Sequence, residues 1–181
     1  MRTTPGLKAR PTTDKIRQSI FNILMNDIES RETLDLFAGS GALGIEALSR
    51  GAASAVFVES GHQQARAIKT NLKELDLKAD VLEADYKAAA RLLAESNIAF
   101  DIIFADPPYE RYSPADVAET VLRYNLLRPG GLFIIEHKTG GMIPEGRLNL
   151  LKRRRFGQTE VSFYVCKRNQ DMPEGDLSGD L

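Results

Sequence analysis

The sequence has few of the residues that build disulfide frameworks and metal sites. Of its 181 residues, only one is cysteine and two are histidine. A single cysteine, Cys166, excludes an intramolecular disulfide, and its apolar neighbours indicate a small core residue. Because one cysteine with His62 and His137 does not make a metal site, we expect no metal and no catalytic role for either histidine.

The chain also lacks a long apolar segment. No run approaches the roughly 20 residues of a membrane-spanning helix, and 1–5 lacks the apolar stretch of a signal peptide. Hydrophobic residues nevertheless make up 43%, which is enough for a core on both sides of one sheet. We therefore expect a single domain over 1–168, acting as a monomer in the cytoplasm.

A positive net charge, which is typical of RNA-binding proteins, is missing as well. The net charge is −1, but the segment 169–181 carries four acids and no base. Without those acids the chain has 24 basic against 21 acidic residues, a net charge of +3. Because 169–181 has neither aromatic residues nor periodicity, we interpret it as a disordered acidic tail.

The basic residues gather near the two ends of the remaining chain. Phosphate contacts by such clusters give affinity without sequence specificity. An ordinary solvated face is the alternative, above all for the second cluster. We predict that nucleic acid binds at six basic residues: Arg10, Lys15, Arg17, Arg153, Arg154 and Arg155.

Alternating strand and helix patterns predict an α/β fold. A first helix over 13–27 should have Thr12 or Thr13 as its N-cap. Strands are expected near 33–37, 54–58, 79–84, 100–105 and 131–136, and helices near 42–50, 61–75, 86–95 and 114–126. Residues 129–131 predict a turn into the fifth strand. A closing pair, near 148–156 and 159–167, meets at a hairpin turn, so the last strand should run antiparallel.

A glycine-rich turn follows the first predicted strand. The segment 35–44 reads DLFAGSGALG and satisfies the fingerprint G-x-G-x-x-G, and Glu59 stands about 20 residues beyond Gly39. This pattern permits two kinds of cofactor. One is a nicotinamide or flavin dinucleotide, and the other is S-adenosylmethionine, whose ribose hydroxyls Glu59 would equally hold.

Acidic residues end four of the predicted strands, at Asp35, Glu59, Asp85 and Asp106. Ligands of open α/β sheets bind at this edge. A carboxylate at Asp35 suits the ammonium group of a methionine moiety and would repel a pyrophosphate, and Asp85 is placed to accept from an adenine amine. Each acid alone is often a solvated strand end or a helix cap. The four together favour S-adenosylmethionine.

The fourth strand runs into Asp106-Pro107-Pro108-Tyr109. The Asp106 carboxylate and the Pro107 carbonyl can accept both hydrogens of a flat exocyclic amine, and Tyr109 offers a face on which a base can stack. Two prolines make this backbone stiff. The pattern therefore predicts a catalytic site for methyl transfer at Asp106, Pro107 and Tyr109, and a plain turn that ends a strand is the alternative.

Four segments resemble the bacterial RsmD-type family, which methylates a guanine N2 amine in 16S ribosomal RNA. They are RPTTDKIRQSIFNIL (10–24), DLFAGSGALGIEALSRGA (35–52), VFVE (56–59) and DIIFADPPY (101–109). The resemblance implies a Rossmann-like methyltransferase fold with a seven-stranded, mostly parallel sheet. It also implies S-adenosylmethionine as cofactor and ribosomal RNA, within an assembling small subunit, as partner. Residues implied to hold the cofactor are Asp35, Phe37, Gly39, Ser40, Gly41, Glu59, Asp85 and Asp106.

The chain departs from this family at its start. Members usually carry a short basic segment before the Pro-Gly-Leu motif, which stands here at 5–7, almost directly after Met1. We therefore expect either a missing RNA-contacting arm or a shortened chain, and a weaker hold on the substrate than on the cofactor.

Three other functions compete with this reading. A DNA adenine methyltransferase shares the tetrapeptide at 106–109, but the chain has no room for a separate target-recognition domain. The same fold could instead methylate a small amine. A dinucleotide-dependent oxidoreductase, or a binding module without chemistry, remains the alternative of a different class.

Overall fold

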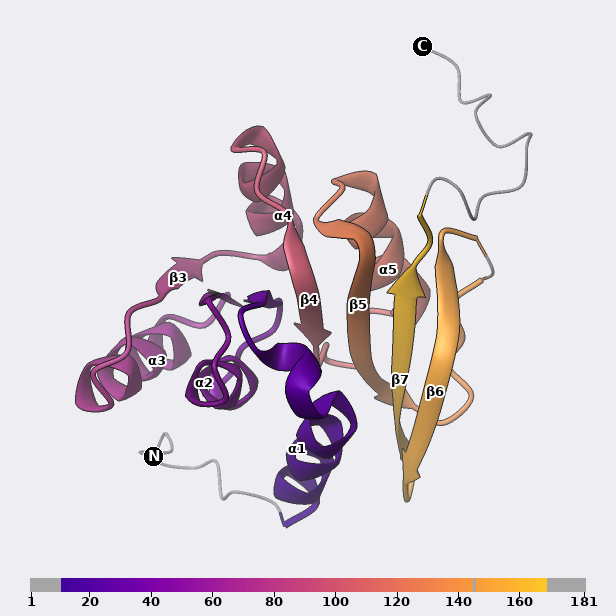
Figure 1. Ribbon diagram of the computed structural model, residues 1–181, viewed down its shortest axis with the longest axis horizontal. Helices are drawn as coiled ribbons and strands as arrows, with labels where there is room; N and C mark the ends of the chain where they lie inside the picture. The colour runs from indigo at the N-terminus through magenta and orange to yellow at the C-terminus, as the bar shows by residue number, and fades with distance from the viewer. Residues whose placement is uncertain (1–10, 145, 169–181) are drawn as a thin grey trace.

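A seven-stranded sheet runs through the centre of the computed structural model, which describes residues 11–144 and 146–168 (Figure 1). Its strand order is β3-β2-β1-β4-β5-β7-β6, and only β7 opposes its neighbours. The predicted seven-stranded, mostly parallel sheet with an antiparallel last strand is thus confirmed. The strands are β1 (Glu32–Asp35), β2 (Ser54–Glu59), β3 (Asp80–Glu83), β4 (Phe100–Ala105), β5 (Leu127–Lys138), β6 (Leu148–Phe156) and β7 (Thr159–Cys166).

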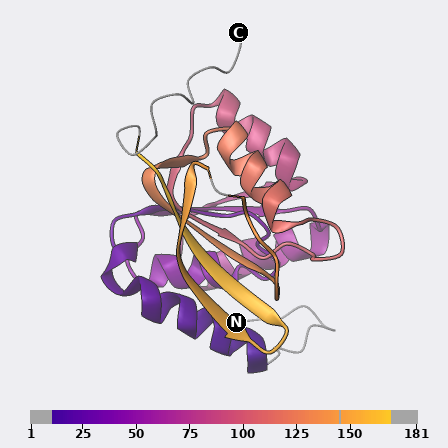
Figure 2. The ribbon, with the colours of Figure 1, turned by 90° about the vertical axis from the view of Figure 1, so that its right-hand side faces the viewer.

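Helices cover both faces of the sheet (Figure 2). On one face α1 packs over β4, β5 and β7, and α2 and α3 pack over β1 and β2. On the other face α4 and α5 close a second core. The helices are α1 (Pro11–Leu24), η1 (Met25–Ile28), α2 (Ala42–Ser49), α3 (His62–Glu74), α4 (Tyr86–Glu95) and α5 (Pro114–Arg123). In the described part of the chain, none of them is long and apolar enough to cross a membrane.

Two predicted boundaries are wrong. Helix α1 already begins at Pro11, so an N-cap at Thr12 or Thr13 is excluded. Proline suits a first helical position because its missing N–H would have no intrahelical partner there. Strand β5 begins at Leu127 and includes 129–131, which were predicted as a turn. The strand passes through this segment at a register shift against β4, where a proline can be tolerated.

The parallel register aligns the carboxyl ends of the central strands along one edge. Asp35 pairs with Phe57 of β2 and with Phe104 of β4, and Ala105 pairs with Ile135 of β5. The residues that follow these strands therefore meet at the same edge, which faces down in Figure 1.

Helix α2 approaches the sheet unusually closely at Gly44. A Cβ atom placed on Gly44 would lie 2.3 Å from the ring of Phe57, a fully buried side chain. The third glycine of the fingerprint therefore permits close packing between helix and strand. The same packing brings the Gly44 amide within 3.2 Å of Asp35 Oδ2.

We expect Gly44→Ala to destabilise the fold by about 1–3 kcal/mol, because the added methyl group would overpack the Phe57 ring. Urea unfolding at equilibrium measures this loss. Gly146→Ala is the matched control, since a Cβ at Gly146 would meet no atom within 4 Å. Equal stability of the two variants would show that α2 can move away from β2 at little cost.

Candidate active site

A cavity of about 670 Å³ opens at the carboxyl edge of the sheet. Its walls come from the loops that follow β1, β2, β3 and β4, and from the end of β5. Predicted site residues on these walls are Phe37, Gly39, Glu59, Asp85, Asp106, Pro107 and Tyr109. Residues that sequence reasoning missed are also present, among them Tyr86, Arg111, Tyr112 and Glu136.

Glu59 is fixed by two backbone amides. Its Oε2 accepts from the Gly39 amide and its Oε1 from the Gly61 amide, both at 2.7 Å. Gly39 has a φ of +54°, a left-handed conformation that glycine adopts readily. The carboxylate at the end of β2 therefore holds the glycine turn, and its remaining lone pairs are free to accept hydroxyl groups.

Asp35 lies beneath the turn and is not part of the cavity wall. It is 2% exposed, its Oδ2 accepts from the Gly44 amide, and its buried Oδ1 has no hydrogen-bond partner among the described residues. Burial raises the pKa of Asp35 to about 7, against the opposing effect of the Gly44 amide. Direct contact between Asp35 and a ligand remains a prediction, but its negative charge lies next to the cavity floor.

One wall of the cavity is aromatic. The rings of Phe37, Tyr86 and Tyr112 contact one another, with centroids 4.8–5.8 Å apart. Beside them, Asp85 is the N-cap of α4 and accepts from the Lys87 amide at 2.9 Å. Its second oxygen accepts from the Tyr112 hydroxyl at 3.3 Å. Asp85 is thus a helix cap and also a wall residue with an acceptor next to a flat apolar surface.

The loop after β4 carries the predicted catalytic residues. The Pro108 carbonyl accepts from the amides of Arg111 and Tyr112, at 2.9 and 3.2 Å. No group of the described chain donates to the Pro107 carbonyl. Asp106 lines the cavity and is exposed to solvent there, although protein atoms surround much of its carboxyl group. The tight turn therefore leaves two acceptors available, the carbonyl of Pro107 and the carboxylate of Asp106.

Glu136, near the end of β5, adds a second carboxylate to this group. The Tyr109 hydroxyl donates to Glu136 Oε1 at 2.6 Å. Burial, with the negative charges of Glu136 and Asp35, raises the pKa of Asp106 to about 7. Burial also raises the pKa of the Tyr109 hydroxyl, with Asp106 adding to the shift, so that Tyr109 remains a proton donor. The hydroxyl of Tyr109 is therefore held by a hydrogen bond, so the ring face is not the only part of this side chain with a role.

Two residues predicted to hold the cofactor, Ser40 and Gly41, do not line the cavity. The Ser40 carbonyl accepts from Asn71 Nδ2 of α3 at 3.4 Å. A Cβ on Gly41 would lie 3.2 Å from Ile68 of the same helix. Ser40 and Gly41 thus fix the turn against α3, and a direct contact of either with a cofactor stays a prediction.

The predicted nucleic-acid residues do not form one surface. Arg10 lies outside the described residues. Arg17 forms ion pairs with Asp14 and Glu46, at 3.2 and 3.9 Å. Lys15 and Arg154 border one groove, which α1 and β6 enclose. Arg153 and Arg155 lie on the opposite face of β6, because side chains alternate along a strand.

The histidines and the cysteine are placed away from the cavity. His62 is the first residue of α3 and bonds Glu83 at 2.7 Å. His137 lies within β5 and is buried against Ser162, with an Nε2–Oγ distance of 2.8 Å. Cys166 is a buried core residue, and burial raises the pKa of its thiol. No group of metal-ligating side chains occurs in the segments that the structure describes.

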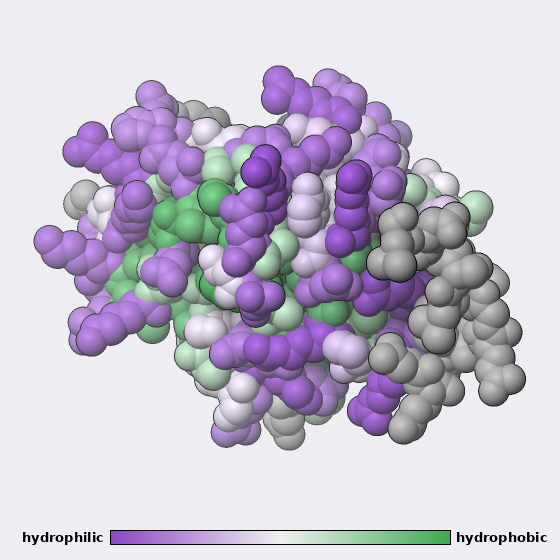
Figure 3. Space-filling view, turned by 90° about the horizontal axis from the view of Figure 1, so that it is seen from above, coloured by the Kyte–Doolittle hydropathy of each residue, from purple (hydrophilic) through white to green (hydrophobic). Residues whose placement is uncertain are grey.

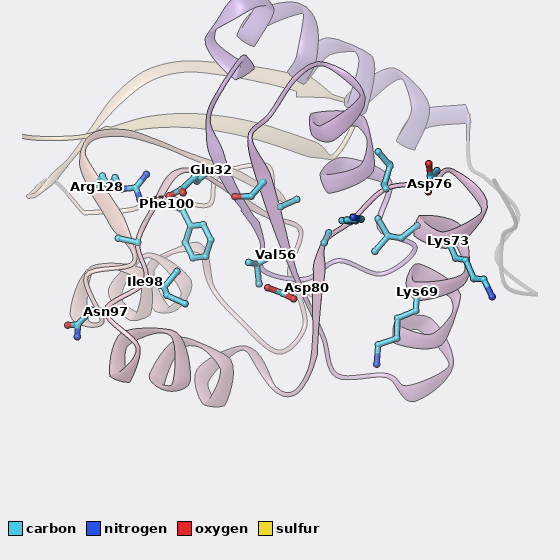
Figure 4. Close-up of a pocket in the computed structure, with 17 residues that line it drawn as sticks. Glu32, Val56, Lys69, Lys73, Asp76, Asp80, Asn97, Ile98, Phe100 and Arg128 are labelled. Carbon is cyan, nitrogen blue, oxygen red and sulfur yellow. Dashed lines mark hydrogen bonds and ion pairs between the residues drawn. The ribbon is translucent and has the colours of Figure 1, made fainter.

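A larger cavity, of about 990 Å³, lies at the opposite edge, where the strands begin. Apolar side chains gather in a hollow on the left of this face (Figure 3). Figure 4 shows that Phe100 and Arg128 lie at one end of this cavity and Lys69 at the other. Arg128 pairs with Glu32 and with Asp101. This cavity lies away from the glycine turn and from the residues at 106–109, which line the cavity at the carboxyl edge.

Comparison with known proteins places the chain in a family. The sequence model of the family described as conserved hypothetical protein 95 matches residues 1–165. The chain is 43% identical over 171 residues to ribosomal RNA small subunit methyltransferase D of Escherichia coli, covering 91% of this chain and 81% of that protein. The chain belongs to this family. The RsmD-type resemblance of the motifs is thereby confirmed.

Solved structures agree with this membership. The structure of yhhF from Escherichia coli has a TM-score of 0.80 and 32% identity, covering 91% of this chain and 90% of that chain. The T. thermophilus 16S rRNA N2 methyltransferase RsmC, solved in complex with AdoMet and guanosine, has a TM-score of 0.67 and 28% identity. That match covers 90% of this chain but 44% of RsmC. The methyltransferase fold expected of this RsmD-family chain is thus confirmed.

The raised pKa of Asp106 predicts that this side chain opposes folding above neutral pH. A carboxyl group whose pKa is higher in the folded state contributes stability at low pH, and this contribution is lost as the pH rises from about 4 through about 7. Asp106→Asn should therefore melt a few degrees above the wild type at pH 8 and lose this advantage at pH 4. The gain is limited because Asp106 borders solvent.

Asp116→Asn is the control of opposite sign. Bonds with Ser113 in the cap of α5 lower the pKa of Asp116, so this variant should be the less stable protein at pH 8. Thermal melts at both pH values measure the two differences. An Asp106→Asn variant that melts below the wild type at pH 8 would contradict the prediction that ionised Asp106 lowers the stability of the fold.

Proposed function

We propose that this protein transfers a methyl group from S-adenosylmethionine to the exocyclic N2 amine of a guanine in small-subunit ribosomal RNA. The proposal rests on one observation: the amides of the glycine turn already donate hydrogen bonds to carboxylates of the protein. The Gly39 amide donates to Glu59 and the Gly44 amide donates to Asp35. A dinucleotide's pyrophosphate would need such amides at the start of the helix.

The charge of the cavity supports a cationic cofactor. Four carboxylates line it, and Arg111 is the one basic side chain among the described residues of its wall. Those four are Glu59, Asp85, Asp106 and Glu136. S-adenosylmethionine carries a sulfonium and an ammonium group, which such a cavity would attract, whereas a pyrophosphate would be repelled. Beneath the same floor, the buried Oδ1 of Asp35 has no hydrogen-bond partner among the described residues.

The aromatic wall supports a site for the adenine ring. Phe37 and Tyr112 provide flat surfaces, and Asp85 presents carboxylate oxygens next to them. Glu59 stands between this wall and the glycine turn, where ribose hydroxyls would lie. These features support a cofactor position between Glu59 and Asp85, with the methionine end directed toward the glycine turn.

The choice of guanine in ribosomal RNA rests on the relatives. The E. coli relative is named a ribosomal RNA small subunit methyltransferase, and RsmC was solved with AdoMet and guanosine. The substrate side of the cavity in this chain supports a flat amine, because two acceptors and a tyrosine converge there. No separate domain for duplex DNA is apparent in the described residues, all of which belong to one sheet and its covering helices.

The mechanism requires the chain to hold the amine and to stabilise the charge that develops on it. When bound, S-adenosylmethionine supplies an activated methyl group. Asp106 and the Pro107 carbonyl accept the two amine hydrogens, which turns the nitrogen lone pair out of the ring plane and toward the methyl group. As the bond forms, positive charge develops on the nitrogen, and the Asp106 carboxylate stabilises it. A pKa near 7 also lets Asp106 take up the released proton.

Glu136 and Tyr109 position this chemistry. The bond from the Tyr109 hydroxyl to Glu136 fixes the ring against the end of β5, so that its face is presented to a base. The charge of Glu136 raises the pKa of Asp106, behind the larger effect of burial. Glu136 is therefore a positioning residue that also sets the proton affinity of its neighbour.

A methyl-transfer assay tests the proposed function. Labelled S-adenosylmethionine is offered with naked 16S RNA, assembled small subunits or DNA, and the modified nucleoside is identified by mass spectrometry. We expect N2-methylguanosine from one of the RNA substrates. Calorimetry should detect binding of S-adenosylmethionine and none of NAD. Methylation of DNA adenine, or tight NAD binding alone, would overturn the proposal.

Asp106→Ala should lower methyl transfer at least about a hundredfold, because a preorganised acceptor is lost in the transition state. Affinity for S-adenosylmethionine, measured by calorimetry, should change little. Asp106→Asn should be intermediate, since an amide oxygen accepts a hydrogen bond but carries no charge. Full activity of Asp106→Ala would reduce 106–109 to a structural turn.

The pH profile should report the coupling between Asp106 and Glu136. With both substrates below saturation, kcat/KM should rise as Asp106 ionises, through a pH of about 7. Glu136→Gln keeps an acceptor for Tyr109 but removes the neighbouring charge, so the rise should move to lower pH. Glu83, at the end of β3, bonds His62 outside the cavity, so Glu83→Gln is the control. An unshifted profile in Glu136→Gln would leave Glu136 a purely structural role.

A further inference from the structure

A basic groove of about 500 Å³ lies between α1 and β6. Its described lining contains three basic side chains and no acidic one. The lining residues are Lys15, Gln18, Ser19, Asn22, Ile23 and Met25 from the first helical segment, and Lys152 and Arg154 from β6. Lys15, Lys152 and Arg154 are exposed. In contrast to Arg17, none of the three forms an ion pair with a carboxylate of the described chain.

The strand register sends the bases of β6 to two different faces. Lys152 pairs with Phe163 and Arg154 with Val161, and both partners belong to the core beneath α1. Paired residues share a face of the sheet, so Lys152 and Arg154 lie on the α1 side. Arg153 and Arg155 therefore lie on the other side. There Arg153 approaches Glu160 at 3.9 Å, and Arg155 Nε donates to the Gly157 carbonyl.

The groove adjoins the active-site cavity through one row of residues. Glu136 of β5 pairs with Val161 of β7, and Val161 pairs with Arg154 of β6. Two strand spacings separate Arg154 from Glu136, roughly 10 Å between backbones. The turn between β6 and β7 is also tied to β5, because the Thr139 amide donates to the Gln158 carbonyl. In Figure 1 the start of α1 and this turn lie at the bottom, the side to which β4 and β5 point.

We propose that the groove between α1 and β6 binds the phosphate backbone of the RNA beside the nucleotide that enters the cavity. The inference rests on the proposed function, since it names the surface that the same substrate uses. Unpaired, exposed lysine and arginine with amide and hydroxyl neighbours are the groups that contact phosphates. The short backbone distance between Arg154 and Glu136 lets one RNA strand reach both places. The partner is therefore RNA backbone, held by charge and not by base sequence.

Because the side chains of β6 alternate between two faces, two double variants of the same strand can be compared. Lys152→Gln with Arg154→Gln removes two charges from the groove, and Arg153→Gln with Arg155→Gln removes two from the opposite face of the same strand. Binding to transcribed 16S RNA is measured by filter retention at several salt concentrations. The groove variant should lose about tenfold in RNA affinity near 0.1 M salt. The slope of its log binding constant against log salt concentration should become shallower by about 1–2. The opposite-face variant should keep the wild-type slope.

Further measurements separate charge from folding. Arg154→Gln and Arg155→Gln alone repeat the comparison while keeping the ion pair between Arg153 and Glu160, and thermal melts check that each variant folds. Lys152→Arg with Arg154→Lys keeps the charges and should restore the wild-type slope. S-adenosylmethionine affinity should be the same in all variants.

The outcomes distinguish the groove from the proposed function. An equal loss of RNA affinity in the two double variants would mean that only net charge matters, and it would overturn the proposal that the groove binds RNA. An unchanged slope in the groove variant of an enzyme that methylates RNA would overturn the groove and leave the proposed function standing. A wild type that binds RNA through the groove but transfers no methyl group to it would overturn the proposed function alone.

Discussion

Two carboxylates hold the glycine turn in place, and the active site is built around them. Glu59 binds the amides of Gly39 and Gly61, while Asp35 binds the amide of Gly44. These bonds join the ends of β1 and β2 to the start of α2, so the floor of the cavity depends on both strands. The close approach of α2 at Gly44 is part of the same arrangement. Negative charge is thus built into a turn that in other proteins would receive a phosphate.

The acids at this site disfavour one another's ionisation. Burial and mutual repulsion raise the pKa values of Asp35 and Asp106 to about 7. A cation bound among these carboxylates would reduce the repulsion between them. Tyr109 relieves part of it in advance, since its hydroxyl donates to Glu136. Stability and activity therefore make opposite demands on the same carboxylates.

Much of this site could be predicted from the sequence because strand ends of a parallel sheet meet at one edge. That rule placed Glu59, Asp85 and Asp106 on one cavity correctly. The same rule applies to Glu136, which ends the strand predicted near 131–136 and which the sequence-based set of site residues lacks. The fingerprint glycine Gly44 permits the close packing of α2, but the burial of Asp35 beneath the turn follows from the tertiary contacts and not from that pattern alone. The roles of the predicted residues in binding and catalysis stay predictions.

The basic run at 152–155 shows a different limit of sequence reasoning, and it has a second consequence. A register shift between Leu150 and Lys152 decides which bases face α1, and such a shift depends on tertiary packing. Strand β6 is also the outer strand of the sheet, with backbone groups that another chain could pair with. Four consecutive positive charges along that border repel a second copy of themselves. The run that includes the two β6 residues assigned to RNA, Lys152 and Arg154, thus also opposes edge-to-edge aggregation of the protein.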